Sequence, residues 1–204
     1  HCEARPPQAE VESILNQIEF AEKAGYSGTL HICHISDQSS LGKVARAKEN
    51  AGFQITMGVT PHHCMLYDSM MTKEEGLYLK MNPPLRRREM QKKLFHAVCD
   101  GRVDCLATDH APHTHRDKTV RFASGVPSWI FYRKAVSELR KAGLSHRLLD
   151  GLTHENAADI FSVRNAVKNK TSYATLIEST GISDEQISEE YGFPAELWNM
   201  IAKE

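Results

Sequence analysis

The chain has 204 residues, a formal net charge of -1 and 41% hydrophobic residues, a composition typical of one soluble globular domain. The near-neutral charge argues against nucleic acid as a partner, because such binding needs a basic excess. No apolar run approaches the roughly 20 residues that span a bilayer, so we expect no membrane insertion. The count of 11 histidines is high for this length and directs attention to metal binding or catalysis.

Apolar runs alternate with amphipathic stretches from the start of the chain. In chain order, the pattern predicts a helix over 8–24, a strand over 29–35, a helix over 40–51, a strand over 53–59, a long polar loop, a helix over 87–100, a strand over 103–108, and, after another loop, a helix over 128–142. Strands that alternate with helices through short connections predict βα units and a parallel sheet. We therefore expect an α/β protein.

The last part of the chain, residues 164–204, is predicted to be an acidic helical tail. Residues 171–204 hold seven acids and one lysine. Ser183 and Pro194 could each begin a short helix. The acidity argues against DNA binding by these helices, so we expect them to pack onto the domain or onto a partner.

The five cysteines contain no C-x-x-C pair, so the spacing favours neither a disulfide framework nor a structural zinc knuckle. Cys33, Cys99 and Cys105 lie in apolar runs and are expected to be small buried hydrophobic residues. This usage is typical of a reducing compartment, and we expect a cytoplasmic protein.

Histidines and carboxylates recur where the predicted strands end, which is the edge that carries the chemistry of parallel α/β proteins. His34 lies at the carboxyl end of one predicted strand, Asp109 follows another, and His1 precedes the first helix. Two imidazoles and a carboxylate suit Zn²⁺, which can turn bound water into a nucleophile at neutral pH. The alternative for any one histidine is a buried, hydrogen-bonded side chain, which we expect for His31. His96, His146 and His154 are expected at the surface.

Six strings follow one another along the chain: H-C-E-A-R from His1, H-I-C-H-I-S from His31, V-T-P-H-H from Val59, K-M-N-P-P-L-R from Lys80, A-T-D-H-A-P-H from Ala107 and S-G-V-P from Ser124. Together they resemble the dihydroorotases of the amidohydrolase superfamily, from residue 1 to about residue 163. The metal-binding positions fit any cyclic amidohydrolase, including hydantoinases and allantoinases. The strings N-P-P-L-R and D-H-A-P-H point more narrowly to dihydroorotase.

The resemblance implies a fold and a metal site. Residues 1–163 would form the second half of a (β/α)8 TIM-type barrel, and residues 164–204 would add the helical tail. One or two zinc ions would lie at the carboxyl ends of the strands, bound by His1, His34 and Asp109. Asp109 would also be the catalytic residue, taking a proton from the attacking hydroxide and giving it to the leaving ring nitrogen.

The resemblance also implies how the substrate, dihydroorotate or carbamoyl aspartate, is bound. Asn82 and His113 would hydrogen-bond its carboxylate and ring, and the backbone at Gly125 and Pro127 would complete the ring pocket. His62 and His63 would have a structural or ligand-supporting role. Arg86 would either favour an anionic substrate or be a solvated residue.

Two family features are absent from the sequence: the H-x-H-x-R string of the first strand and the lysine or aspartate of the fourth. A whole barrel needs about 250 residues, so we expect a piece of a longer active dihydroorotase. An inactive dihydroorotase-like protein that binds a partner such as a carbamoyltransferase, and another cyclic amidohydrolase, are the alternatives. Half a barrel would leave strand edges open, which favours association, for example as a homo-oligomer.

Overall fold

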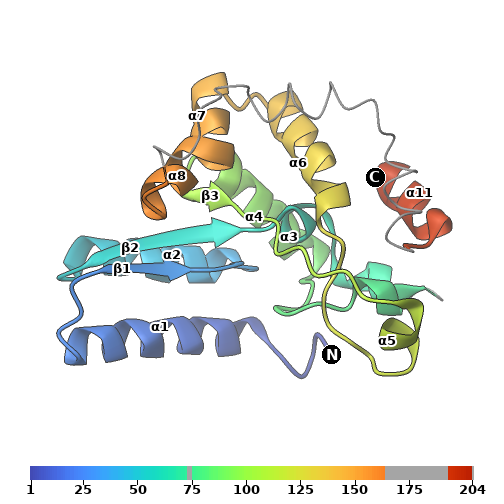
Figure 1. Ribbon diagram of the computed structural model, residues 1–204, viewed down its shortest axis with the longest axis horizontal. Helices are drawn as coiled ribbons and strands as arrows, with labels where there is room; N and C mark the ends of the chain where they lie inside the picture. Colours follow the sequence, from blue (N-terminus) through green and yellow to red (C-terminus); the bar gives the residue numbers. More distant parts are fainter. Residues whose placement is uncertain (73–74, 164–192, 204) are drawn as a thin grey trace.

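The computed structural model describes residues 1–72, 75–163 and 193–203 (Figure 1). The helices and strands follow in the order α1 (Pro7–Lys23), β1 (Thr29–Ile32), α2 (Gln38–Asn50), β2 (Gln54–Val59), α3 (Pro61–Met65), α4 (Arg88–Cys99), β3 (Cys105–Leu106), α5 (His115–Thr119), α6 (Trp129–Lys141), α7 (His146–Asp150), α8 (Asn156–Ile160) and α11 (Ala195–Lys203). All four helices predicted from periodicity are present, together with short ones that the periodicity did not predict.

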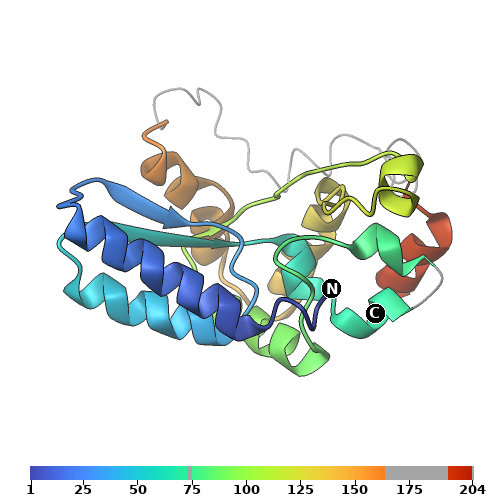
Figure 2. The ribbon, with the colours of Figure 1, turned by 90° about the horizontal axis from the view of Figure 1, so that it is seen from below.

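The strands of the described residues form one parallel sheet in the order β1-β2-β3. Thr29 of β1 lies opposite Gln54 of β2, and Gly58 of β2 lies opposite Cys105 of β3. Helices α1 and α2 lie side by side along the strands (Figure 2). The prediction of an α/β fold with parallel strands is confirmed, and parallel pairing brings the carboxyl ends of all three strands to one edge.

The main hydrophobic core lies between the sheet and the helices that pack beside it. Each long helix buries residues spaced three or four apart, such as Ile14 and Ile18 of α1 or Leu41 and Val44 of α2. This spacing places the apolar side chains on one helix face. The core fixes the strands, and the strands fix the positions of the loops that follow them.

Two predicted strands are shorter in the structure than in the sequence analysis. The first ends at Ile32 instead of residue 35, and the third is reduced to Cys105–Leu106. The chain leaves the extended conformation at His34, with φ of 40°, and at Asp109, with φ of 47°. A left-handed residue cannot continue a ladder of extended backbone, so both strands stop before these positions.

The stretch between β2 and α4 was expected to be a long polar loop, and this prediction is wrong. Thr60 caps α3 by accepting a hydrogen bond from the His63 N–H, and 3-10 helices follow at Asp68–Thr72 and Gly76–Leu79. Buried apolar side chains form part of a second core in this stretch: Leu66, Tyr67, Met70, Leu79, Met81 and Leu85. They have no regular period in the sequence, which is why a pattern search misses them.

The predicted tail is described only at its end. Residues 164–192 and 204, and with them the helix expected after Ser183, lie outside the described residues. The helix expected near Pro194 is confirmed as α11. Phe193, Leu197 and Ile201 are buried in the second core, so this end of the chain packs onto the domain as expected.

Of the three cysteines expected to be buried, Cys105 is buried and Cys99 is half-buried. Burial raises the pKa of the Cys64 thiol to about 12 and that of Cys105 to about 11, so both stay protonated. Cys33 is exposed, so its predicted burial is wrong, because it follows the last paired residue of β1. No helix within the described ranges combines the length and apolar character needed to cross a membrane.

Candidate active site

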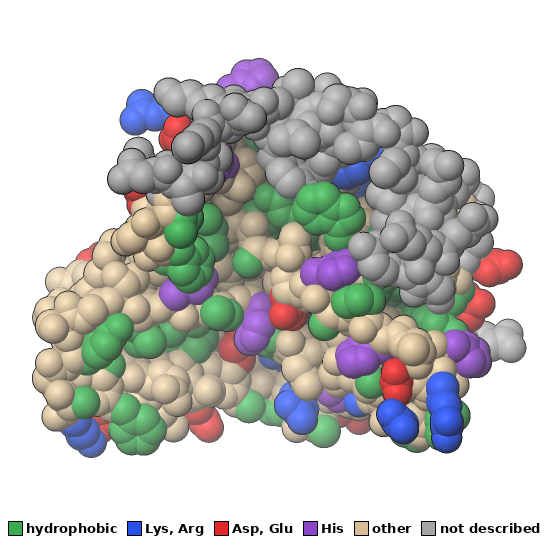
Figure 3. All heavy atoms as spheres, in the orientation of Figure 1, with side chains coloured by type: hydrophobic (Ala, Val, Ile, Leu, Met, Phe, Trp, Pro, Cys, Tyr) green, Lys and Arg blue, Asp and Glu red, His purple; other side chains and the backbone are tan. Residues whose placement is uncertain are grey.

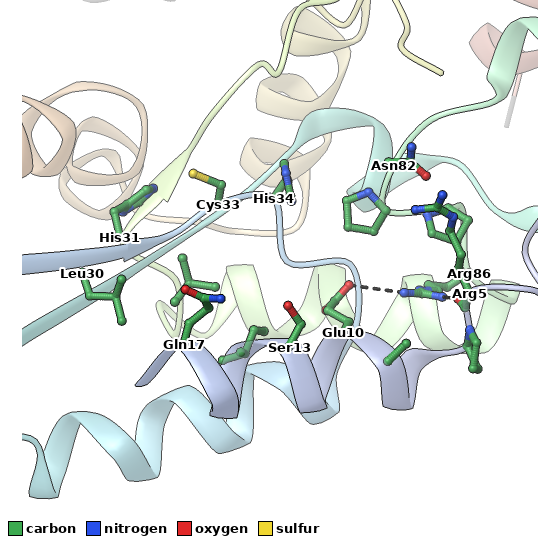
Figure 4. Close-up of a pocket in the computed structure, with 16 residues that line it drawn as sticks. Arg5, Glu10, Ser13, Gln17, Leu30, His31, Cys33, His34, Asn82 and Arg86 are labelled. Atoms are coloured by element: carbon green, nitrogen blue, oxygen red, sulfur yellow. Dashed lines mark hydrogen bonds and ion pairs between the residues drawn. The ribbon is translucent and has the colours of Figure 1, made fainter. Parts of the chain in front are cut away.

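A cavity of about 550 Å³ opens between α1, the carboxyl end of β1 and the segment after Met81. Two predicted site residues, His34 and Asn82, line it together with Arg5, Glu10 and Cys33 (Figure 4). The surrounding face of the molecule carries several histidine side chains near its middle (Figure 3). The structure therefore brings a predicted metal-binding residue and a predicted substrate-binding residue to one cavity.

His34 lies two residues after the end of β1 and Asp109 three residues after the end of β3, and both have left-handed backbones. Non-glycine residues in this region cost about 1–3 kcal/mol each and are concentrated at functional sites. The Asp109 carboxylate is exposed. Burial and, second, the Asp109 charge raise the pKa of the Cys33 thiol, which places Asp109 near the end of β1.

His63 is buried and neutral, and its hydrogen bonds define its tautomer. The Pro83 carbonyl can only accept, so Nε2 carries the proton and donates it over 2.9 Å. Nδ1 then accepts from the Thr60 hydroxyl at 2.7 Å. Burial lowers the pKa of His63 to about 3, against the opposing hydrogen bond to Pro83. The side chain supports the loop that carries Asn82, as the predicted structural role requires.

His62 is buried beside His63, and it contacts the segment after Asp109. Its Nδ1 is 2.7 Å from the Ser128 hydroxyl, which also lies 3.5 Å from the Asp109 carbonyl oxygen. Burial, followed by the neighbouring histidines, lowers the pKa of His62 well below its ordinary value. Among the described residues, His62 Nε2 has no hydrogen-bond partner. Through Ser128, His62 helps to fix the backbone at Asp109.

The segment of residues 80–86 receives contacts from distant parts of the chain. His1 Nε2 is 2.8 Å from the Met81 carbonyl oxygen, and the Gly125 N–H donates to the Lys80 carbonyl over 2.9 Å. His1 thus contacts the residue before Asn82, but it does not line the cavity that His34 lines.

The predicted substrate-binding loops lie together on the far side of this segment. His113 Nε2 donates to the Ser124 carbonyl over 3.0 Å, next to Gly125. Gly125 has φ of 138°, and a Cβ there would come within 2.7 Å of the Ala111 carbonyl oxygen and 2.8 Å of His113 Nε2. Only glycine fits this close approach. Pro127 is buried, so it acts through the backbone it constrains.

Arg86 is not solvated, so that interpretation of it is wrong. It lines the cavity with His34 and Asn82, and its role in favouring an anionic substrate stays a prediction. It is buried, and its guanidinium donates to the Ser36 hydroxyl at 2.8 Å, the Arg5 carbonyl at 2.6 Å and Glu10 at 3.3 Å. Among the other histidines, His31 is hydrogen-bonded to Thr56 at 2.8 Å, as expected, but it is half-buried and not buried. The expected surface positions of the other three are confirmed, because the histidines at 96, 146 and 154 are all exposed.

The metal-binding capacity of the site was tested against the arrangement of its donor side chains. Within residues 1–72, 75–163 and 193–203, no three histidine, cysteine, aspartate or glutamate side chains are grouped so that they could hold a metal ion. His34 and Asp109 offer a nitrogen and an oxygen at the same edge, but His1 does not complete a set with them. The described residues therefore do not fit a complete metal site.

Sequence reasoning missed two residues that shape the site. Ser128 stands just beyond the S-G-V-P string, and Lys118 lies in the highly charged stretch H-R-D-K, which is typical of a surface helix. Lys118 is nevertheless buried and hydrogen-bonded to main-chain carbonyls. No feature of the sequence pattern distinguishes it from its exposed neighbours.

No protein-family model matches the chain, but curated proteins do. It is 37% identical over 166 residues to a dihydroorotase of Lactobacillus gasseri, covering 78% of this chain and 38% of that protein. It is 33% identical over 177 residues to a dihydroorotase of Fusobacterium nucleatum, covering 84% of this chain and 41% of the relative. The chain thus spans about two fifths of the length of these relatives.

Solved structures show the same fold. A D-hydantoinase from Bacillus sp. AR9 matches with a TM-score of 0.67 and 25% identity, over 75% of this chain and 35% of that one. A dihydroorotase from Saccharomyces cerevisiae matches with a TM-score of 0.61 and 16% identity, over 76% and 44% of the two chains. The chain is therefore dihydroorotase-like, a relative of the cyclic amidohydrolases.

Proposed function

We propose that the chain is part of a metal-dependent dihydroorotase and contributes the second half of its (β/α)8 barrel, residues 1–163. The reaction is the reversible hydrolysis of the cyclic amide of dihydroorotate to N-carbamoyl-aspartate, in pyrimidine biosynthesis. One observation carries the proposal: identity of 37% to a dihydroorotase extends over 78% of this chain. The solved yeast dihydroorotase, whose fold is similar, is a complex with 5-fluoroorotic acid, a cyclic ligand with a carboxylate.

In this proposal the chain's own residues orient the substrate and move a proton. The exposed Asp109 carboxylate accepts the proton of the attacking water and returns it to the ring nitrogen that leaves. Asn82 and His113 hydrogen-bond the substrate, and the backbone of Gly125 and Pro127 closes the ring pocket. The backbone that carries this carboxylate is left-handed at Asp109 and is contacted by the Ser128 hydroxyl.

The metal is part of the proposal, with Zn²⁺ as the ion that the donor types favour. His34 and Asp109 are the donors that the strand edge supplies, whereas His1, the third ligand by resemblance, is hydrogen-bonded to the Met81 carbonyl in this structure. A complete set of metal ligands needs a further donor, because no three histidine, cysteine, aspartate or glutamate side chains are grouped to hold a metal within the described ranges.

The test is dihydroorotate hydrolysis by the purified full-length protein, with both halves of the barrel and added Zn²⁺, and with bound metal measured in parallel. We expect turnover, and we expect Asp109→Asn to lower kcat by about 10²–10⁴-fold. Asp100→Asn, which alters an exposed carboxylate after α4, is the matched control and should change nothing. Full activity of the Asp109→Asn variant would refute the catalytic role.

The same assay separates the alternatives. The fold similarity to a D-hydantoinase favours a second candidate, and hydrolysis of hydantoin without hydrolysis of dihydroorotate would establish it. Absence of both metal uptake and turnover would favour an inactive protein that binds a carbamoyltransferase. A homo-oligomer and a cytoplasmic location complete the proposal, and light scattering of the purified protein tests the first.

A further inference from the structure

Lys118 of α5 is a lysine with only 3% of its surface exposed. Its ammonium donates to the carbonyl oxygens of Lys80 at 2.9 Å, Ala123 at 3.1 Å and Gly125 at 2.7 Å. An ammonium group has three N–H donors, so these three acceptors use all of them. The side chain therefore links three main-chain carbonyl groups through its hydrogen bonds.

The three carbonyls belong to two segments that are far apart in the sequence. Lys80 precedes Asn82 by two residues, on the rim of the cavity, whereas Ala123 and Gly125 flank the Ser124 carbonyl that His113 contacts. The same segments also meet through the hydrogen bond from the Gly125 N–H to the Lys80 carbonyl. Lys118 therefore sets the spacing between two proposed parts of the substrate pocket.

Packing alone does not account for a lysine at this position. Burial and the nearby Lys80 charge lower the pKa of Lys118 to about 8, so holding the ammonium here is unfavourable. A methionine would fill a similar volume without removing a charge from water. A methionine, however, could not donate hydrogen bonds to the three carbonyl oxygens.

We propose that Lys118 is a positioning residue of the substrate pocket. Its hydrogen bonds hold the backbone near Asn82 close to the backbone near Gly125. Both segments can then contact the same substrate, a cyclic amide that carries a carboxylate. The inference rests on the proposed function for the identity of that ligand. The link between the two backbone segments rests on the three hydrogen bonds, and its effect can be measured without any ligand.

The first experiment is amide hydrogen exchange on the full chain, comparing Lys118→Met with the unaltered protein. We expect the Gly125 N–H to exchange about tenfold faster, because the loss of charge-assisted hydrogen bonds loosens its segment, while β2 amides keep their rates. Arg116→Met, which changes an exposed cation on the same helix, should leave the Gly125 rate unchanged. An unaltered Gly125 rate, or equal acceleration in β2, would overturn the inference.

The second experiment separates positioning from a general structural role. In Lys118→Met we expect KM for dihydroorotate to rise about tenfold and kcat to fall by less than about threefold. Adding Asn82→Ala should cause little further rise in KM, because Lys118 acts through that segment. The positioning role would be overturned if KM stayed unchanged in Lys118→Met. It would also be overturned if the fold-increase in KM of the double variant equalled the product of the two single increases. Absence of turnover in the unaltered full-length protein would refute the proposed function, and the exchange rates would still decide whether Lys118 holds the two segments together.

Discussion

The buried pair His62 and His63 makes the protein sensitive to mild acid. Both imidazoles are neutral in the folded state, because burial lowers their pKa values, to about 3 for His63. In the unfolded chain each titrates near 6.5. Above that pH both states hold the same protons, and below it the unfolded state binds more, so the free energy of unfolding falls with pH.

The size of the effect follows from the two groups. His63 contributes about 1.4 kcal/mol per pH unit below pH 6.5, so two pH units remove about 3 kcal/mol, and His62 adds to the loss in the same direction. That loss is a large fraction of the stability of many domains. We expect the urea midpoint, followed by circular dichroism, to drop steeply between pH 6.5 and 4.5.

A substitution isolates the contribution of one imidazole. His63→Gln keeps a donor for the Pro83 carbonyl but cannot titrate, so the slope of stability against pH should decrease by about 1.4 kcal/mol per unit. His96→Gln, at an exposed position on α4, is the matched control and should leave the slope unchanged. An unchanged slope in His63→Gln would mean that the folded protein protonates this side chain, and the reasoning from burial would fail.

Three further substitutions test the packing around the site. Arg86→Met leaves the carboxylate of Glu10 without its cationic partner and should cost about 3–5 kcal/mol in urea unfolding. Adding Glu10→Gln should recover part of this cost, and a cost below about 1 kcal/mol would contradict the buried network. Gly125→Ala should destabilise by at least about 2 kcal/mol and expose the loop to proteolysis, whereas protease resistance equal to the unaltered protein would contradict the close approach. Ile201→Ala should lower stability by about 2–5 kcal/mol if α11 is docked as described, and a neutral result would show that it is not.

The elements with strong periodicity were predictable from the sequence, and the irregular ones were not. Helix α1 has apolar residues at regular spacing and was predicted to within one residue at each end. The stretch from α3 to α4 has buried residues, such as Leu66 and Leu79, that pack through short turns without a common period. Their burial depends on contacts with α6 and α11, which a local pattern does not contain.

The candidate site was predictable in its parts but not in its connections. Motif order identified His34 and Asn82, and the structure places both at one cavity. The same motifs gave no indication that Arg86 is used in a buried network or that Lys118 is buried. Those roles depend on which backbone carbonyls come near the side chain, and this is fixed only by the folded chain.

The segment of residues 80–86 also has a consequence for the order of folding. This segment is hydrogen-bonded to His1, which is 80 residues away in sequence, and to Lys118, which is 38 residues away. Closing such long loops is slow and entropically unfavourable until the strands and long helices are already in place. The pocket should therefore assemble last during refolding, so that recovery of ligand binding lags behind recovery of helical circular dichroism. A nascent chain released before α5 is synthesised would have a sheet but no pocket.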